Sequence, residues 1–221
     1  SDDLQTVDLL KYSQIYCDKD CLLLYKAMNQ FRQNIYEISQ LDILTLNTAA
    51  SIGEAIMFKE GAFDGVVPVS GVPRDFIQKC VVGGRVCVSD NEAKVVHGKV
   101  ADFDSVSNYP SAICRLKGYP KGTAKGIEQA LLNDQESLKS FLNGQDMYYA
   151  RVRITKVAKH YKTPLISYIN DKGTRCWDDT EAVGKTIYMD KIGLEGMELF
   201  HGMEYEILAG YYYNEGFNPK V

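Results

Sequence analysis

The chain has 221 residues, of which 45% are hydrophobic and 24% charged, and its formal net charge is −4. This composition predicts a folded protein with a sizeable core, one domain and part of a second. The negative charge excludes a surface that attracts nucleic acid over its whole extent. We find no signal peptide and no run of about 18 apolar residues, so we expect an intracellular protein without a membrane anchor.

The six cysteines lack Cys-x-x-Cys spacing and are too sparse for a disulfide scaffold, so we expect reduced thiols in the core. With only three histidines in the chain, a zinc site is not expected.

The chain begins with a predicted long helix, from about Asp3 to Ile38. Apolar residues recur there at helical spacing: Leu24, Met28, Phe31 and Ile35. Tyr16 and Asp20 extend this stripe towards the N-terminus and lie one turn apart on the same face. An aspartate on an apolar stripe is costly unless a cation or hydrogen-bond donors meet it. The alternative interpretation is an ordinary exposed aspartate near the edge of the helix.

Helical character ends near Phe58, and turn residues then follow at short intervals: Gly61, Gly65, Pro68, Gly71 and Pro73. They predict a linking segment. Next come the paired glycines Gly83 and Gly84, which allow positive φ and close backbone approach, and Arg85, whose planar cation suits a phosphate. A β-bulge or hairpin turn would explain the glycine pair equally well.

A β-prone run then predicts a buried strand that ends at Asp104; its apolar members are Val95, Val96, Val100, Ala101 and Phe103. Pro110 suits the first turn of a short helix, and Gly118 is a plausible stop. Such a strand, turn and helix start would aim unpaired backbone N–H groups at one point, which suits a polyphosphate. Asp104 would face that point and hold magnesium there. The alternative is an ordinary turn or helix cap.

The whole spacing resembles the first palm motif of family B DNA polymerases, Asp-x-x-Ser-Leu-Tyr-Pro-Ser; the matching residues are Asp104, Ser107, Tyr109, Pro110 and Ser111. The resemblance implies that Asp104 is a catalytic metal ligand, with Mg²⁺ or Mn²⁺ as the cofactor, and that Tyr109 packs under the deoxyribose. It also implies that Ser105, Val106, Ser107, Asn108 and Tyr109 bind the nucleotide. Asn108 replaces the usual Leu. Because this position is expected to contribute mainly its backbone N–H, we interpret the change as a small adjustment of the nucleotide site. Asp102 either assists the metal site or reaches solvent.

Two upstream matches agree in order with this motif. Tyr16 and Asp20 resemble the third exonuclease motif of the same family, Tyr-x-x-x-Asp. This implies that Asp20 is a catalytic metal ligand and that the Tyr16 hydroxyl orients the water that cuts a mismatched 3′ end. The glycine pair is similar to the Tyr-x-Gly-Gly segment of the protein-primed branch, which implies that Gly83, Gly84 and Arg85 bind single-stranded DNA. Val81 stands where that segment has its tyrosine.

The C-terminal part has weaker signals. We expect short strands in 163–168 and 175–177, helices over 128–142 and 194–201, and strand over 205–208 and 211–213. Tyr211, Tyr212 and Tyr213 either form a base-stacking platform or alternate across a half-buried strand, which we favour. A mix of cations and rings suggests either a DNA-binding strip or a solvated amphipathic strand: Tyr148, Tyr149, Arg151, Arg153, Lys156, Lys159, His160, Tyr161 and Lys162.

The sequence therefore predicts an α+β protein: the helical end of an exonuclease domain, joined to part of a polymerase palm (an antiparallel sheet with helices on one side) and an insertion. The expected segments are exonuclease over 1–65, first palm part over 66–120, insertion over 121–187 and continued palm over 188–221. In the family, an insertion near this place helps to bind the priming protein and the template.

The family also needs an earlier Asp-x-Glu exonuclease motif, a Lys-bearing fingers helix and an Asp-Thr-Asp turn, and the printed sequence contains none of them. We therefore expect a fragment of a DNA-directed DNA polymerase that is inactive alone. Its expected partners are primer-template DNA, deoxynucleotide triphosphates and a priming protein. The alternative function is a non-catalytic module that binds DNA or the priming protein, and a weaker alternative is an unrelated α/β protein with a chance match.

Overall fold

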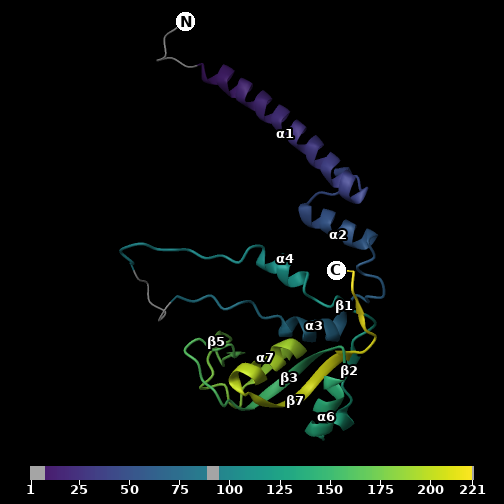
Figure 1. Ribbon diagram of the computed structural model, residues 1–221, viewed down its shortest axis with the longest axis vertical. Helices are drawn as coiled ribbons and strands as arrows, with labels where there is room; N and C mark the ends of the chain where they lie inside the picture. The colour runs from purple at the N-terminus through teal and green to yellow at the C-terminus, as the bar shows by residue number, and fades with distance from the viewer. Residues whose placement is uncertain (1–7, 89–94, 221) are drawn as a thin grey trace. The chain divides into compact units, whose positions relative to one another are not determined.

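The computed structural model describes residues 8–88 and 95–220 (Figure 1). The chain divides into two compact units, residues 1–61 and 62–221. Within the described ranges, no helix is both long and apolar enough to cross a membrane.

The first unit is helical, as predicted, and residues 3–7 of the expected first helix lie outside the described ranges. Helix α1 covers Leu9–Ser39; Asp8 caps its start by accepting from the backbone N–H groups of Leu10 and Lys11 at 3.1 Å. It ends at Gln40, which adopts the left-handed conformation with φ 55°. A short 3₁₀ helix, η1 (Ile43–Thr45), and helix α2 (Ala49–Lys59) follow. The predicted helical character up to about Phe58 is therefore confirmed.

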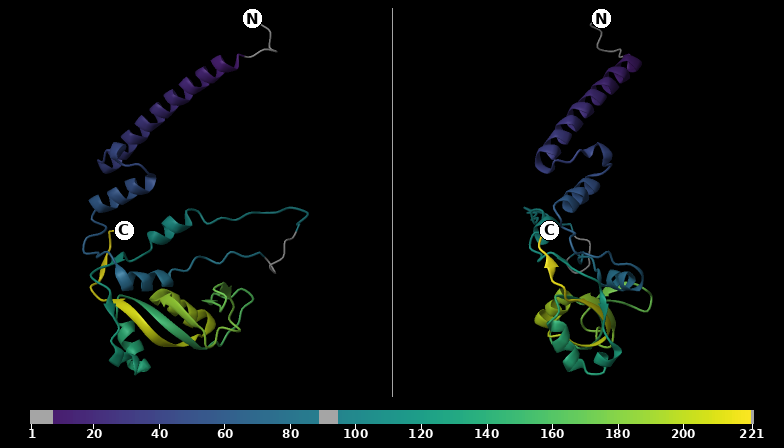
Figure 2. Two further views of the ribbon diagram at one scale, coloured as in Figure 1. Left: turned by 180° about the vertical axis from the view of Figure 1, so that it is seen from behind. Right: turned by 90° about the vertical axis from the view of Figure 1, so that its right-hand side faces the viewer.

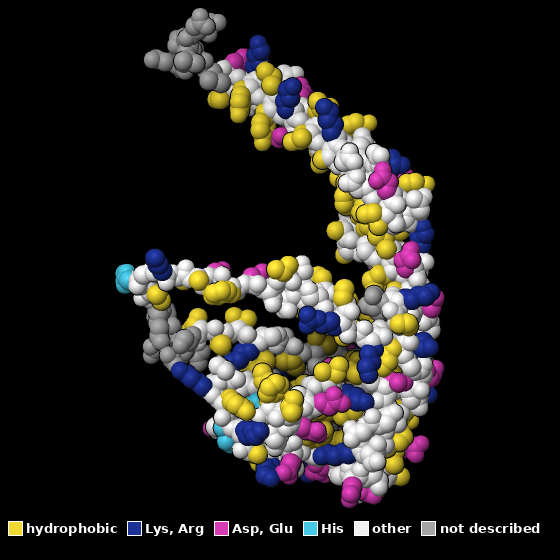
Figure 3. Space-filling view, viewed as in Figure 1, with side chains coloured by type: hydrophobic (Ala, Val, Ile, Leu, Met, Phe, Trp, Pro, Cys, Tyr) yellow, Lys and Arg dark blue, Asp and Glu magenta, His cyan; other side chains and the backbone are white. Residues whose placement is uncertain are grey.

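Polar contacts hold the turn that follows α1. Arg32 donates from Nε and Nη2 to the two carboxylate oxygens of Asp42, and Lys59 donates to the Ser39 carbonyl. The α2 start has a capping box in which the side chains of Thr48 and Ser51 and their backbone N–H groups bond reciprocally. Most of the apolar stripe of α1 is nevertheless exposed, and Figure 3 shows hydrophobic side chains along this helix.

The second unit is built on a four-stranded antiparallel sheet with the order β2-β7-β3-β6. The strands are β2 (Lys125–Gly126), β3 (Met147–Lys156), β6 (Thr186–Asp190) and β7 (Glu204–Tyr213). Three helices accompany the sheet on its well-packed face: α5 (Gln129–Leu132), α6 (Gln135–Asn143) and α7 (Lys191–His201). Figure 2 shows two further views of this arrangement. The α+β class and the antiparallel sheet are confirmed.

The core of this unit lies between one face of the sheet and these helices. Alternate β3 residues point into it, because side chains of a strand alternate between the two faces; Ala150, Val152 and Ile154 are at most 1% exposed. Leu138 and Leu142 of α6 and Leu194 of α7 are fully buried against them. The predicted helix over 128–142 is divided at Asp134, whose carboxylate caps α6 by accepting from the backbone N–H groups of Glu136 and Ser137.

Helix α3 (Gly71–Cys80) corrects two expectations. The segment was predicted to be a linker, because Gly71 and Pro73 are turn residues. Proline is nevertheless tolerated in the first turn of a helix, where its missing N–H is not needed. Phe76 contacts the rings of Tyr188 and Tyr211 edge to face, each at 5.2 Å. These tyrosines lie on the face opposite the core, so helices cover both faces of the sheet and not one.

Two small strand pairs complete the unit. Strands β4 (Ser167–Ile169) and β5 (Arg175–Trp177) pair antiparallel around a turn in which Asn170 Oδ1 accepts from the backbone N–H groups of Lys172 and Thr174. Strand β5, helix α7 and the long strand β7 confirm the predictions for the C-terminal part, whereas only 167–168 of the strand expected over 163–168 is in a strand. Strands β1 (Tyr119–Pro120) and β8 (Phe217–Asn218) also pair antiparallel.

The three consecutive tyrosines alternate across β7, as favoured. Tyr212 contacts the ring of Phe141 at 5.1 Å, whereas Tyr211 and Tyr213 point to the other face, towards Phe76 and Tyr149. Their rings are therefore packed against protein and do not form a stacking platform.

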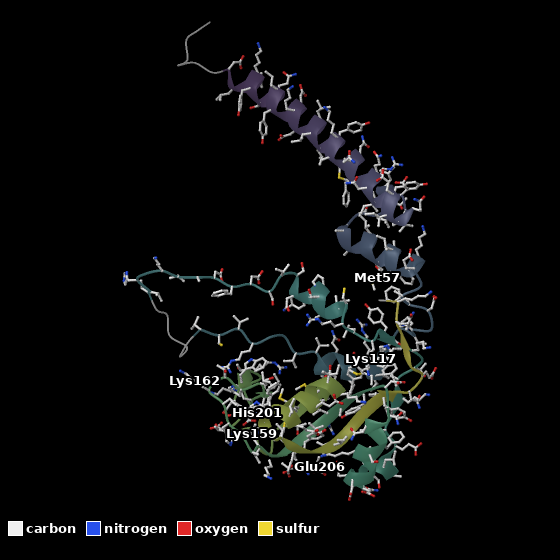
Figure 4. All side chains as sticks on the ribbon, viewed as in Figure 1. Met57, Lys117, Lys159, Lys162, His201 and Glu206 are labelled. Atoms are coloured by element: carbon white, nitrogen blue, oxygen red, sulfur yellow. The ribbon has the colours of Figure 1, made fainter. Side chains whose placement is uncertain are left out.

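The basic strip is mainly a solvated amphipathic strand. Arg153 pairs with Glu206 at 2.5 Å and Lys156 with Glu204 at 2.6 Å (Glu206 is labelled in Figure 4), while Val152 and Ile154 point inward. Two of the cations thus have acidic partners on the neighbouring strand.

The boundary predicted between the insertion and the continued palm falls inside β6, which spans residues 186–190. Strand β3, from before this boundary, pairs with both β6 and β7. Residues 121–187 and 188–221 therefore contribute to one sheet and one core. We call the folded part from Gly118 to Asn218 the sheet body.

The expectation of core thiols is wrong for four of the six cysteines. Cys17, Cys21, Cys87 and Cys114 are exposed, Cys176 is half-buried and only Cys80 is buried; none is in a disulfide. The mean composition of a chain does not reveal which cysteines its core encloses.

Candidate functional site

The predicted metal ligand Asp104 lies in an extended, exposed stretch. Every residue from 95 to 117 is exposed, and we call this segment the motif arm. Residues 95–103 were predicted to form a buried strand, and this expectation is wrong: Val96 is 70% and Phe103 91% exposed, and the segment has no strand. A β-strand needs a neighbour to take up its backbone hydrogen bonds, and no described residue provides one here.

The helix predicted after Asp104 is present. Helix α4 covers Asn108–Ile113, and Pro110 lies in its first turn as expected. Ser107 precedes it in the left-handed conformation with φ 47°, which is uncommon for a residue other than glycine. The turn is held by the Ser111 N–H, which donates to the Ser107 carbonyl at 2.8 Å, and by the Ser111 hydroxyl, which donates to the Val106 carbonyl. The sequence thus folds locally as a turn followed by a helix start.

The residues of the predicted nucleotide site are exposed throughout. Tyr109 is 80% exposed and Val106 87% exposed, and the fold covers neither side chain. The chain continues through a turn to Gly118, which has φ +118°. A Cβ atom at Gly118 would lie 1.7 Å from the Asn218 carbonyl oxygen, so only glycine allows the arm to join the sheet body at this point.

The predicted exonuclease pair lies on α1, in the first unit. Tyr16 and Asp20 are one helical turn apart and both exposed. The Tyr16 ring stacks on Tyr12, with ring centroids 6.3 Å apart and planes inclined by 22°. The predicted shared face is thus present, on a helix whose apolar stripe is largely uncovered. Asp104, the other predicted metal ligand, belongs to the second unit.

The predicted DNA-binding residues follow α3. Gly83 and Gly84 are exposed, and a Cβ atom at either would meet nothing within 4 Å. Neither has φ in the left-handed region, and the described residues 81–88 form no bulge or hairpin, so the alternative interpretation of the glycine pair is wrong. Arg85 is half-buried and donates from Nη1 to the Pro164 carbonyl at 3.3 Å. This bond attaches the segment to the sheet body.

Carboxylate oxygens are suitable ligands for magnesium, and the predicted sites each contain an exposed aspartate. Over residues 8–88 and 95–220, no group of three or more His, Cys, Asp or Glu side chains lies close enough to hold a metal ion. Asp104 and Asp20 can therefore each supply one carboxylate to an ion whose remaining oxygen ligands come from substrate, water or other protein segments.

Sequence reasoning missed a buried polar cluster at the end of α7. His201 is fully buried; its Nε2 accepts from the Leu165 N–H at 3.1 Å, so Nδ1 carries the proton and donates to the Lys159 carbonyl at 3.0 Å (Figure 4). Asp179, 2% exposed, accepts from the Tyr161 N–H at 2.7 Å. Both side chains hold the loop after β3 and are therefore structural. No motif signals this role.

Sequence reasoning also missed a pocket of about 400 Å³ between the end of α3 and the edge of the sheet. Its charged lining residues are Lys79 and Arg175, and the rest of its polar lining comes from Gln78, Ser167, Tyr168, Thr186 and Tyr188. These residues are scattered over more than a hundred positions of the sequence, so no local pattern could have identified them.

The comparison with protein families identifies the class of protein to which this fold and these exposed motifs belong. Residues 2–218 match the model of DNA polymerase type B, organellar and viral. The chain belongs to this family of DNA polymerases, whose substrates are DNA and deoxynucleotides. Neither the curated proteins nor the solved structures gave a match.

Proposed function

We propose that this chain is part of a protein-primed DNA polymerase that carries out template-directed nucleotidyl transfer with two divalent metal ions and proofreads in the 3′–5′ direction. The observation that carries the proposal is the family match over residues 2–218, within which the three motifs occur in the expected order. A chance match to one motif would not extend over nearly the whole chain.

At the polymerase site, Asp104 is the residue that would hold a catalytic Mg²⁺ or Mn²⁺ ion. Its carboxylate is exposed beside the turn that begins α4, so it can share an ion with the phosphates of a nucleotide. When bound, such ions neutralise the charge that develops on the transferred phosphoryl group. Asp104 would position the ion, and Asp102, two residues earlier and also exposed, would reach solvent.

The residues after Asp104 would hold the nucleotide. Tyr109 would pack under the deoxyribose, where its ring excludes a 2′-hydroxyl by shape, and its 80% exposure leaves the ring accessible. The backbone N–H groups of Ser105, Val106, Ser107 and Asn108 would bind the triphosphate. Asn108 is the first residue of α4, so its side chain is not required for the start of that helix.

Proofreading would use the first unit. Asp20 would hold a metal ion, and the Tyr16 hydroxyl would orient the attacking water. In this proposal, residues 1–65 are the end of an exonuclease domain, 66–120 the first part of the palm, 121–187 the insertion that binds the priming protein, and 188–221 the continued palm. Gly83, Gly84 and Arg85 would contact single-stranded DNA. We place the protein inside the cell, where a virus, plasmid or organelle replicates its DNA.

The test is primer extension by the complete polymerase that contains this segment, with Asp104→Asn and, as the matched control, Asp102→Asn. We expect Asp104→Asn to lower the extension rate by more than about a hundredfold, because loss of a metal ligand costs several kcal/mol in the transition state. Asp102→Asn should remain within a few fold of the parent. Equal rates for parent and Asp104→Asn would exclude Asp104 as a metal ligand.

The exonuclease assignment has its own test. Asp20→Ala should abolish removal of a mismatched 3′ nucleotide while leaving extension of a matched primer intact. Asp18→Ala, two residues away on a different face of α1, is the control. Loss of both activities in Asp20→Ala would indicate a structural role for the residue.

The second candidate is a non-catalytic module that binds DNA or the priming protein. The observation that favours it is the sheet body, whose cluster of buried hydrophobic residues spans 138–207 and contains none of the predicted catalytic residues. In that case the complete protein would bind DNA with unchanged affinity after Asp104→Asn, and the parent itself would show no Asp104-dependent extension.

A further inference from the structure

In the pocket between α3 and the sheet edge, all the charged lining residues are cations. Lys79 comes from the last turn of α3, Arg175 from β5 and Thr186 from β6, and no carboxylate lines the pocket. Its volume of about 400 Å³ exceeds that of a few water molecules and would admit a phosphate with part of a sugar. The pocket is therefore suited to an anionic group of moderate size.

The donors in this pocket are held in place by the fold. Arg175 Nη1 donates to the hydroxyl oxygen of Ser167 at 2.9 Å, which fixes one edge of its guanidinium. Ser167 is itself 3% exposed. Lys79 lies over the ring of Tyr188, with Nζ 5.4 Å from the ring centroid. A guanidinium fixed at one edge keeps its other N–H groups in a planar fork that matches two phosphate oxygens.

Nearby acidic groups reduce this positive charge but do not enter the pocket. The pKa of the Tyr168 hydroxyl is raised, chiefly by burial and then by the charges of Asp178 and Glu181, so both carboxylates lie near this lining residue. Asp178 accepts hydrogen bonds from the Thr180 N–H and hydroxyl and also bonds to the Tyr168 hydroxyl. Lys79 and Arg175 are the charged groups that line the cavity.

The pocket is continuous with the segment proposed to touch DNA. Val81 lines the pocket, and Gly83 and Gly84 follow it after one residue. Arg85 is fixed to the Pro164 carbonyl, three residues before the pocket residue Ser167. Lys79 therefore precedes the glycine pair Gly83 and Gly84 in the chain, and Arg85 follows it. The two glycines have no side chain that would block close approach to the backbone. A single strand of nucleic acid needs such an arrangement of charges along its backbone and room for close approach.

We infer that this pocket binds a backbone phosphate of single-stranded DNA, with Arg175 and Lys79 as the phosphate ligands, on a strand that continues over Gly83 and Gly84 to Arg85. The inference rests on the proposed function, because it extends the DNA-binding role of the glycine segment to residues far away in the sequence. A nucleotide triphosphate is a poorer occupant, since the motif arm carries the predicted triphosphate site and its backbone donors.

The test measures binding of a fluorescein-labelled 20-nucleotide oligo(dT) to the 221-residue chain by fluorescence anisotropy at several salt concentrations. For the double variant Lys79→Gln/Arg175→Gln we expect the dissociation constant to rise at least about tenfold. The slope of log affinity against log salt should fall in magnitude by about 0.7 for each phosphate that the protein no longer neutralises. Arg175→Lys alone should weaken binding less than Arg175→Gln, because it keeps the charge and loses the fork.

The matched control is Lys11→Gln/Lys26→Gln, which removes the same charge from α1 in the other unit and should leave the affinity within about twofold. Thermal unfolding followed by circular dichroism should be the same for both double variants. Equal losses in the two double variants, or an unchanged salt slope in the pocket variant, would overturn the inference. So would normal oligo(dT) binding accompanied by loss of binding to the priming protein.

Failure of this inference differs from failure of the proposed function. Asp104→Asn should leave the oligo(dT) affinity of the chain unchanged while abolishing extension by the complete polymerase. If Asp104→Asn keeps full extension and the pocket variant still loses DNA affinity, the proposed function fails and the pocket assignment stands. If Asp104→Asn abolishes extension and the pocket variant binds normally, only the pocket assignment fails.

Discussion

The sheet body and the motif arm contain similar apolar residues, which are buried in the sheet body and exposed in the motif arm. In the sheet body, Leu138 and Leu194 are fully buried, whereas in the arm Val96 and Phe103 are 70% and 91% exposed. The difference is that β3 has strands on both sides and helices on its inner face, while the arm pairs with no described residue. Hydrophobic residues in a β-prone run show that a segment is suited to burial; the covering surface decides whether it is buried.

The largest expected effect contrasts a core residue with an arm residue. Leu138→Ala should lower the free energy of unfolding of the 221-residue chain by about 2–5 kcal/mol, because it removes buried methyl groups and leaves a cavity. Phe103→Ala should change it by less than about 0.5 kcal/mol, since an exposed ring loses little on truncation. Urea denaturation followed by circular dichroism measures both.

A destabilisation by Phe103→Ala comparable with that of Leu138→Ala would show that the arm is packed in the isolated chain and would remove the contrast. In the complete polymerase the two effects should become more similar if other segments cover the arm.

The next contrast uses two glycines. At Gly210, in β7, a Cβ atom would lie 2.5 Å from the Tyr149 carbonyl oxygen and 2.7 Å from Ile127 Cδ1, so Gly210→Ala must displace backbone or core atoms. We expect a loss of about 1–3 kcal/mol, as for other overpacked positions. At Gly83 a Cβ atom meets nothing within 4 Å, so Gly83→Ala should be neutral or stabilise by up to about 1 kcal/mol.

The affinity for oligo(dT) provides a second measurement for the glycine variants. If DNA approaches the backbone at Gly83, Gly83→Ala should weaken binding although it leaves stability intact. A Gly210→Ala variant that unfolds like the parent would contradict the close approach between β7 and β3.

The sequence predicted the elements whose cause is local. The long first helix, the short strand over 175–177 and the short helix with Pro110 in its first turn follow from periodicity, β-prone residues and Pro110, and all are present. Helix α3 was not predicted because Gly71 and Pro73 are typical turn residues, although both lie in the first turn of the helix. Its packing depends on contacts of Phe76 with Tyr188 and Tyr211, which are distant in the sequence. Tertiary contacts of this kind leave no local pattern.

The candidate sites also differ in whether a local motif predicts their residues or the fold brings those residues together. Motif spacing predicts Asp104 and Tyr109 as site residues, and both lie exposed around the start of α4. Lys79 and Arg175 were not identified, because they come together only when α3 and β5 reach the same edge of the sheet. The buried strand predicted before Asp104 was wrong because apolar composition alone cannot supply the neighbouring strand.

The smallest expected effect concerns two cysteines, one on helix α3, which packs on the sheet, and one in the motif arm. Cys80, at the end of α3, is 7% exposed, and burial, followed by the charge of Asp190, raises the pKa of its thiol to about 12. Cys114, at the end of α4, is exposed. Because the thiolate is the reactive form, a maleimide at pH 8 should modify Cys114 at least about tenfold faster than Cys80, as measured by mass spectrometry of tryptic peptides.

The same pKa fixes the direction of a stability change. The folded-state pKa of Cys80 lies above the unfolded value near 9, so folding favours the protonated thiol. Its contribution to stability is fully present below about pH 9 and is lost as the pH rises towards 12. Cys80→Ala should therefore make the alkaline fall in stability shallower, whereas Cys114→Ala should not. Modification of Cys80 as fast as Cys114 in the native chain would mean that α3 does not stay packed on the sheet, and the pocket beside it would then lack one of its walls.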